Sequence, residues 1–177
     1  MEKQSITVKG IFIKFNVDRV KTELGEKSLR DMEGQYGKPL NFSAMTDYPV
    51  EEEIKLIEII GKMIYPELKS VERWKKMGED DANIFITSQI GRVGLSLFFP
   101  NIENGIKNAS RLFGLLHQGM ICKPIINKDI IALNIENNPY HPNYYVGFFE
   151  KVLQSRNINK KIKVSSIGQN CIYTVVS

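Results

Sequence analysis

The sequence predicts an α+β fold, in which a mainly helical N-terminal part of about residues 1–117 packs on a small antiparallel sheet. Apolar residues recur at three- and four-residue steps through most of this first part, a spacing that is typical of helices. Over residues 118–177 the pattern changes to two hairpins rich in isoleucine and valine. A further helix lies between them, so this part is expected in the order hairpin, helix, hairpin.

The composition is typical of a soluble globular protein, and residues 1–177 are expected to form one domain. Of the 177 residues, 42% are hydrophobic and 25% are charged, and no run approaches the ~20 apolar residues of a membrane span. Cys122 and Cys171 show neither a zinc nor a redox spacing, so both are expected as free thiols in the cytoplasm. The net charge of +4 is scattered outside the cluster Lys160, Lys161 and Lys163, and no nucleic-acid partner is expected.

The first element has an ambiguous pattern. Alternating apolar residues favour an extended segment over residues 6–15, although residues 11–20 also suit the start of a helix. Residues 19–32 predict a helix, and the turn-forming run at 34–39 ends it.

A second helix is expected to start close to Pro49 and to end before Pro66. Asp47 or Tyr48 is the predicted N-cap, and Pro49 suits the first turn because it lacks an amide hydrogen. The glutamates at 51–53 then lie against the positive end of the helix dipole, which explains them without an acid pair. Apolar residues cover most of the remaining circumference, so the helix is expected to be mostly buried.

Three further helical segments are expected before the sheet. Ser70 is the predicted N-cap of a helix at 71–77, and Gly78 separates it from a helix at 80–90. A segment rich in small residues follows at 91–99 and is ended by Pro100. Residues 102–116 then predict a helix with one apolar side.

Each predicted hairpin has its own turn. Residues 120–126 and 129–136 are joined by Asn127 and Lys128, where asparagine tolerates a left-handed backbone. Residues 161–167 and 172–176 are joined through the turn at 168–170.

The helix between the hairpins is the most strongly marked element. Pro139 and Pro142 hold its entry extended, and Asn143 is the predicted N-cap of a helix at 144–156. Its aromatic and aliphatic side chains form one broad face, which must be covered. Gly147 interrupts this face at a cost of roughly 1 kcal/mol relative to alanine, which predicts the close approach of another backbone.

Several short motifs occur in an order that resembles a known family. They are Val8-Lys9-Gly10, Tyr48-Pro49, Tyr65-Pro66, Lys76-Met77-Gly78, and Asn138-Pro139 followed by Tyr145-Val146-Gly147. Their order and spacing resemble a bacterial family of unknown function that occurs as many paralogues in myxobacteria. That family is a relative of the haem nitric-oxide-binding and four-vinyl-reductase-like ligand domains. The resemblance implies helices packed on a small antiparallel sheet, with an apolar cavity between them that holds haem, an aromatic effector or an acyl chain in related domains.

The same resemblance allows haem binding to be examined. Haem-binding relatives supply a proximal histidine from the helix before the sheet, and they hold the propionates with a Tyr-x-Ser-x-Arg run. Counted back from Tyr145, the proximal position falls at residues 105–108, where no histidine stands, and residues 131–136 contain no such run. His117 lies too close to Tyr145 for this role. The resemblance therefore implies a member without haem, and no cofactor is expected.

No catalytic or metal site is expected. His117 and His141 are the only histidines, and neither has a carboxylate or cysteine at ligand spacing. His117 is interpreted as a helix-end residue, His141 as a loop residue and Cys122 as a buried, inert thiol. Gly91 and Gly94 match no phosphate-binding loop. An enzyme is therefore not expected.

Two functions remain. The favoured one is a non-enzymatic small-molecule binding or sensory module for an apolar or aromatic ligand. The alternative is a protein-interaction or dimerisation module with a filled core, whose partner is a second copy or a signalling protein. In the first, Arg111 and the tyrosine hydroxyls are expected to orient an acidic or phenolic head. The pocket candidates are Phe85, Arg111, Leu112, Phe113, Tyr144, Tyr145 and Phe148.

Overall fold

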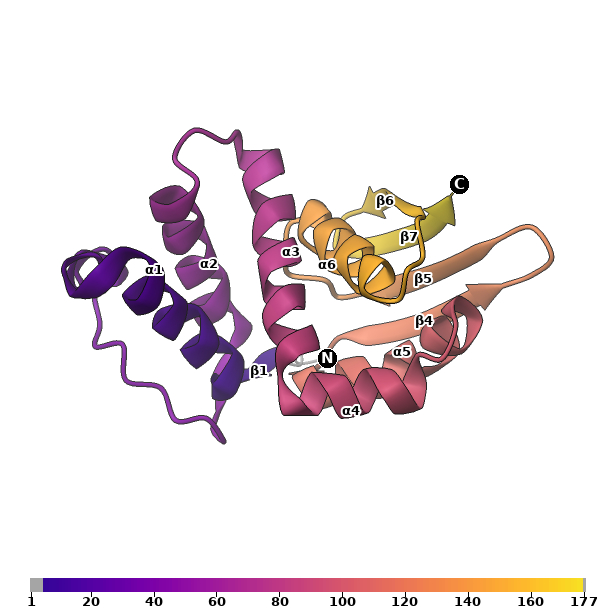
Figure 1. Ribbon diagram of the computed structural model, residues 1–177, viewed down its shortest axis with the longest axis horizontal. Coiled ribbons are helices and arrows are strands. Elements are labelled where there is room, and N and C mark those ends of the chain that lie inside the picture. Colours follow the sequence, from indigo (N-terminus) through magenta and orange to yellow (C-terminus); the bar gives the residue numbers. More distant parts are fainter. Residues whose placement is uncertain (1–4, 177) are drawn as a thin grey trace.

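Two helices, α3 (Ser70–Thr87) and α6 (Pro142–Ser155), lie side by side at the centre of the molecule and join its two halves (Figure 1). The computed structural model describes residues 5–176, apart from the side chains of Ile90, Leu115 and Leu116. Helices α1 (Gly10–Tyr36) and α2 (Val50–Ile64) pack on one side of the pair, and a four-stranded sheet lies on the other. The α+β fold expected from the sequence is confirmed.

The first element of the described residues is the short strand β1 (Thr7–Lys9), which leads directly into α1. The extended segment predicted over residues 6–15 is therefore wrong beyond this strand, and the alternative of an early helix is confirmed. Ile13 and Val20 are fully buried at helical spacing, so one helix face meets the core. The helix kinks at Gly25, where a φ of 82° interrupts the regular backbone.

Strand β1 is the middle strand of a small antiparallel sheet, between β2 (Asp47–Pro49) and β3 (His117–Gln118). The predicted N-cap of α2 at Asp47 or Tyr48 is wrong, because both residues lie in β2 and Pro49 is the capping residue. Helix α2 itself is confirmed. The small sheet ties the start of the chain to the start of α2 and to the end of α5.

Helix α3 is continuous, so the break predicted at Gly78 is wrong. Its N-cap is Lys69 and not the predicted Ser70. Gly78 is tolerated inside the helix because it faces the backbone of α6, where a Cβ would lie 1.9 Å from the carbonyl oxygen of Tyr144. A glycine that resembles a helix end in the sequence is here a contact point in mid-helix.

The close approach predicted at Gly147 is confirmed by the same contact, seen from α6. A Cβ on Gly147 would lie 1.9 Å from the carbonyl oxygen of Lys75 on α3. Each glycine therefore lies over the backbone of the opposite helix. The two helices lie so close together that only glycine, which has no Cβ, fits at positions 78 and 147.

The segment before the sheet forms two helices, α4 (Gln89–Phe98) and α5 (Ile102–Leu116). Most of the small-residue segment predicted at 91–99 is thus helical, and the helix predicted at 80–90 is divided between α3 and α4. Ser88 marks the division, because its Oγ accepts a hydrogen bond from the amide of Gly91 at 3.0 Å. Helix α5 has the predicted bounds.

Both predicted hairpins are confirmed. They form one antiparallel sheet from β4 (Ile121–Ile126), β5 (Ile131–Glu136), β6 (Lys161–Ile167) and β7 (Asn170–Val176), in the order β4-β5-β7-β6. The two-residue turn predicted at Asn127 and Lys128 is wrong, because residues 127–130 separate the strands and Asn127 does not adopt the left-handed backbone. Its side-chain oxygen instead accepts hydrogen bonds from the amides of Asp129 at 3.0 Å and Ile130 at 2.8 Å, which closes the turn between the strands.

Helix α6 begins earlier than predicted, at Pro142. His141 is the N-cap, and its Nδ1 accepts a hydrogen bond from the amide of Asn143 at 3.2 Å. The predicted cap at Asn143 is wrong because Pro142 already occupies the first helical turn. The His141 ring also stacks on Trp74 of α3, with ring centroids 5.9 Å apart.

Two further features bear on the sequence predictions. Over residues 5–176, no helix is long and apolar enough to cross a membrane. Cys122 and Cys171 are both buried free thiols, as expected.

Candidate functional site

A cavity of about 40 Å³ lies where α1, α2, α3, α5 and α6 meet. Its wall is largely aromatic, with a small number of polar side chains from α1, α2, α3 and the end of α5. The lining residues are Phe12, Phe15, Asn16, Glu53, Asp81, Ile84, Phe85, Phe113, His117, Tyr144, Tyr145 and Phe148. Five of the seven predicted pocket residues therefore come together here.

The other two predicted residues lie elsewhere. Leu112 lines a neighbouring apolar cavity of about 60 Å³, which shares Phe85, Phe113 and Phe148 with the first. These three rings form a partition between the two spaces. Arg111 is exposed on α5 and lines neither cavity. Arg111 is therefore not placed to orient a ligand head in either of these two cavities.

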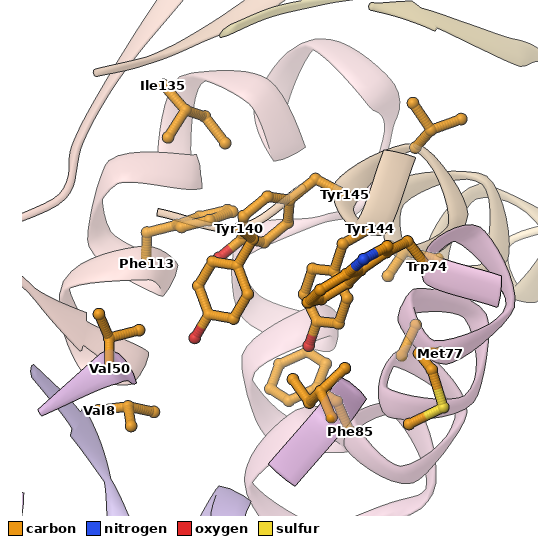
Figure 2. Packing of buried hydrophobic residues seen from close by; sticks show 14 of the residues in the cluster. Val8, Val50, Trp74, Met77, Phe85, Phe113, Ile135, Tyr140, Tyr144 and Tyr145 are labelled. Atoms are coloured by element: carbon orange, nitrogen blue, oxygen red, sulfur yellow. The ribbon is translucent and has the colours of Figure 1, made fainter. Parts of the chain in front are cut away.

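Three polar side chains, two of them buried, form a hydrogen-bonded chain at the cavity wall. The hydroxyl of Tyr140, in the loop before α6, makes a short hydrogen bond with a carboxyl oxygen of Glu53 on α2. On its other side the same hydroxyl is 2.8 Å from Nε2 of His117. Glu53 and Tyr140 are each 3% exposed. Figure 2 shows the ring of Tyr140 beside that of Tyr144, with both hydroxyl groups pointing the same way.

A second carboxyl group, that of the partly buried Asp81, faces the cavity from α3. Oδ2 of Asp81 accepts a hydrogen bond from the hydroxyl of Tyr144 at 2.7 Å. The rings of Tyr140 and Tyr144 stack with their centroids 4.9 Å apart, so the two carboxyl groups are held by a pair of stacked tyrosines. Of the two tyrosine hydroxyls predicted to hold an acidic ligand, that of Tyr144 already binds Asp81, and that of Tyr145 lies 3.8 Å from the sulfur of Met120.

Three polar atoms of the lining have no partner among the described residues. They are Oδ1 of Asn16, Oδ1 of Asp81 and Nδ1 of His117, all inaccessible to solvent. A buried polar atom without a partner costs roughly 1–3 kcal/mol, so such atoms are uncommon unless water or a ligand meets them. All three atoms belong to residues that line the same cavity, so water or a ligand in this cavity could meet them.

Burial shifts the protonation of these groups. It raises the pKa of Glu53 to about 8, and the negative charge of Asp81 adds to this effect. Burial also raises the pKa of Asp81 to about 6, against the hydrogen bond from Tyr144, the charge of Arg19 and the side-chain amide of Asn16, which lower it. Burial lowers the pKa of His117 to about 4, so its ring is neutral near pH 7.

Sequence reasoning missed Asn16, Glu53 and Asp81. The helix dipole accounts for Glu53 locally, but its spacing from Leu56, Ile57 and Ile60 places it on the buried face of α2. Asp81 likewise follows Met77 and precedes Phe85 at four-residue steps on the buried side of α3. An acidic residue within an apolar stripe is the signal that marks both.

No family model matches the chain, and no curated protein sequence does either. Solved structures match over almost its full length. The Fe(II) unliganded H-NOX protein from K. algicida has a TM-score of 0.69 and 11% identity, with 95% of each chain covered. The chain has the H-NOX fold.

Two other H-NOX structures agree with this result. The H-NOX protein from S. oneidensis in the Fe(II)NO ligation state has a TM-score of 0.66 and 13% identity, over 94% of this chain and 97% of that one. A mutant of the T. tengcongensis H-NOX protein has a TM-score of 0.61 and 15% identity, over 94% of both chains. At this identity the likeness establishes the fold and not the ligand.

Haem is implied by these H-NOX neighbours, and the residues of this chain do not fit it. A cavity of about 150 Å³ accepts a single benzene ring, whereas the central cavity measures about 40 Å³ and its apolar neighbour about 60 Å³. The wall presents Glu53 and Asp81, and among its described residues there is no lysine or arginine to pair with propionates. Nε2 of His117 is already hydrogen-bonded to Tyr140. Within residues 5–176 no group of three or more metal-ligating side chains occurs either.

Proposed function

We propose that this chain is a non-enzymatic sensory module that binds a small molecule, without haem, in the central cavity. The observation that carries the proposal is the group of unpartnered, buried polar atoms on Asn16, Asp81 and His117 at one cavity wall. A stable core pairs its polar groups internally, whereas a ligand site keeps some of them for its ligand. The H-NOX fold supports the same reading by analogy with its ligand-binding neighbours.

The short motifs described above support a place within the myxobacterial family of unknown function and its four-vinyl-reductase-like relatives. The buried free thiols Cys122 and Cys171 support a reducing, cytoplasmic location. Both points are part of the proposal.

The size of the cavity limits the ligand. About 40 Å³ accepts a molecule of a few heavy atoms. An aromatic ligand or acyl chain requires the partition of Phe85, Phe113 and Phe148 to move, which would join the two cavities. An acidic head is disfavoured because it would face Glu53 and Asp81.

A ligand screen by thermal unfolding tests the proposal. A ligand present at a hundredfold excess over its dissociation constant stabilises the fold by ~2.7 kcal/mol. Ile84→Phe, which places a ring at the cavity wall, is expected to abolish the shift. Val71→Phe is the matched control, because Val71 lies on the same helix α3 and is 52% exposed. A shift that survives Ile84→Phe contradicts binding in this cavity.

Expression with added haem tests the cofactor. The purified protein is expected to show no Soret band from a stoichiometric site, because the lining residues do not fit a haem. A one-to-one complex with axial histidine ligation contradicts this expectation.

The alternative, a protein-interaction or dimerisation module, is supported by one surface feature. Val93 and Leu97 lie one turn apart on α4 and are 54% and 67% exposed. Light scattering after size-exclusion chromatography separates the two proposals. A dimer that is lost in Leu97→Glu, together with no ligand shift for the cavity, favours the interaction module.

A further inference from the structure

All three unpartnered atoms of the cavity are hydrogen-bond acceptors when Glu53 is ionised. Oδ1 of Asn16 is an amide oxygen, and Oδ1 of Asp81 belongs to a carboxyl group. Both accept hydrogen bonds in their usual states. The character of Nδ1 of His117 depends on where the single proton of the neutral ring lies.

The chain from Glu53 through Tyr140 to His117 has two arrangements of its protons. With Glu53 protonated, the carboxyl group donates to Tyr140, Tyr140 donates to Nε2 of His117, and the ring proton lies on Nδ1. With Glu53 ionised, Nε2 donates to Tyr140, Tyr140 donates to Glu53, and Nδ1 presents a lone pair. The two arrangements differ by one proton, which is lost from Nδ1 of His117. The proton of Glu53 moves to the hydroxyl of Tyr140, and the proton of Tyr140 moves to Nε2 of His117.

The ionised arrangement gives the cavity three acceptors and two negative charges. No lysine or arginine lines its described wall. Two buried carboxylates at one cavity are stable only when a positive charge or protons compensate them. A donor of several hydrogen bonds with one positive charge meets both requirements.

A groove next to the cavity also has more acidic than basic side chains. This groove, of about 400 Å³ between α1 and α3, shares Phe15 and Ile84 with the cavity wall. Its lining carries three acidic side chains, from Asp18, Glu23 and Asp80, against the single cation of Arg19. Arg19 is paired with Glu23 at 2.9 Å and with Asp80 at 2.9 Å, so the groove keeps a small excess of negative charge, which favours cations over anions.

We propose that the central cavity binds a small ammonium-type cation, such as a short primary amine in its charged form, in exchange for the proton of Glu53. This rests on the proposed function and names its ligand class. The N–H groups of the cation donate to Asn16, Asp81 and His117. A cavity of about 40 Å³ has room for roughly three water molecules, and methylammonium with its two heavy atoms lies within that size.

The charged and titratable groups around Glu53 are consistent with this exchange. Asp81 on α3 raises its pKa, as burial does, and Tyr140 stabilises the ionised form through its hydrogen bond. Arg19 on α1 acts on Asp81 and is itself paired with Asp80 at 2.9 Å. Burial raises the pKa of Tyr144 well above its usual value, so this residue keeps its proton and stays a donor to Asp81.

Calorimetry with methylammonium chloride on the full chain tests the proposal. Because binding releases one proton, affinity is expected to rise about tenfold per pH unit between pH 6 and 8 and to level off above the pKa of Glu53, about 8. The measured heat is expected to change with the ionisation enthalpy of the buffer. Methanol, a neutral molecule of the same size, and potassium chloride serve as controls. Affinity that is independent of pH, or equal for methanol, overturns the proposal.

Two substitutions separate the buried acid from its neighbours. Glu53→Gln matches the shape of the protonated acid, so the fold is retained, and it is expected to weaken methylammonium binding at pH 8 at least about tenfold and to remove its pH dependence. Glu51→Gln, in the same turn of α2 but exposed, is expected to leave both unchanged. Equal effects of the two substitutions would overturn the role of Glu53.

Nitrogen NMR of the histidine rings gives a readout that does not depend on affinity. The chain has only two histidines, and His141→Asn identifies the signals of His117. The ring proton of His117 is expected on Nδ1 in the free protein at pH 6.5 and on Nε2 after saturation with methylammonium. The same tautomer in both states overturns the exchange.

The outcomes distinguish this inference from the proposed function. Neutral or apolar compounds that bind in the cavity while ammonium compounds do not would overturn the cation inference and leave the proposed function in place. If no compound of either kind shifts the unfolding midpoint, both are overturned.

Discussion

The close packing of α3 and α6 at Gly78 and Gly147 gives the sharpest prediction for stability. Replacing Gly147 by alanine places a Cβ 1.9 Å from the carbonyl oxygen of Lys75, which is main chain and cannot rotate away. Helices α3 and α6 must then move apart. Overpacking of this kind costs about 1–3 kcal/mol, even though alanine favours a helix by roughly 1 kcal/mol over glycine.

Thermal unfolding followed by circular dichroism measures this effect. For a chain of 177 residues, each kcal/mol shifts the midpoint by roughly 2–4 °C. Gly147→Ala is therefore expected to lower it by roughly 2–12 °C, and Gly147→Leu by more. Gly114→Ala is the matched control, because Gly114 is exposed on α5 and a Cβ there would meet nothing within 4 Å.

The thermal midpoint is expected to fall in Gly147→Ala and to rise in Gly114→Ala, because the control gains helix propensity without a clash. The double variant Gly78→Ala, Gly147→Ala is expected to lose less than the sum of the single losses, because the first substitution already separates the helices. An unchanged or raised midpoint for Gly147→Ala would refute the packing argument.

Two further predictions concern protonation. The pKa of Glu53 is raised from 4.5 to about 8 in the folded protein, so the folded state binds more protons, and the free energy of unfolding should fall by about 1.5 kcal/mol between pH 6.5 and 8. Urea titrations measure this fall. In the same window the unfolded state still loses protons from His117, whose pKa is lowered from 6.5 to about 4 on folding, and this offsets a small part of the fall. Asp81, raised from 3.8 to about 6, titrates mostly below the window. A Glu53→Gln variant that keeps the full fall would contradict this assignment. Burial raises the pKa of Cys122 to about 12, so Cys122 and the buried Cys171 should react with a thiol reagent only after unfolding in guanidinium, and rapid reaction in the native protein would count against their burial.

The sequence predicts the helices whose ends are marked by local chemistry. Helix α5 starts after Pro100, where Asn101 accepts a hydrogen bond from the amide of Asn104 at 2.9 Å, and its bounds are confirmed. Gly78 is not a helix end because its role depends on the backbone of α6, which is distant along the chain. Local propensity contains no information on such a contact.

The candidate site shows the same limit. The aromatic wall was predictable, because large apolar side chains at helical spacing must be buried. The carboxyl groups were not, since Glu53 meets Tyr140 across a separation of 87 residues and Asp81 meets Tyr144 across 63. An acidic residue at a helix start has an adequate local explanation, and only the fold reveals a tyrosine partner.

The strand order of the larger sheet has a consequence for self-association. Within residues 5–176 its outer strands are β4 and β6, whose free edges are open to pairing with another chain. Lys123 and Pro124 are exposed on β4, and Lys161 and Lys163 are exposed on β6. Positive charge and proline at an edge oppose the addition of a further strand. Both edges of the sheet are therefore protected against the edge-to-edge pairing between molecules that leads to fibres in concentrated solutions.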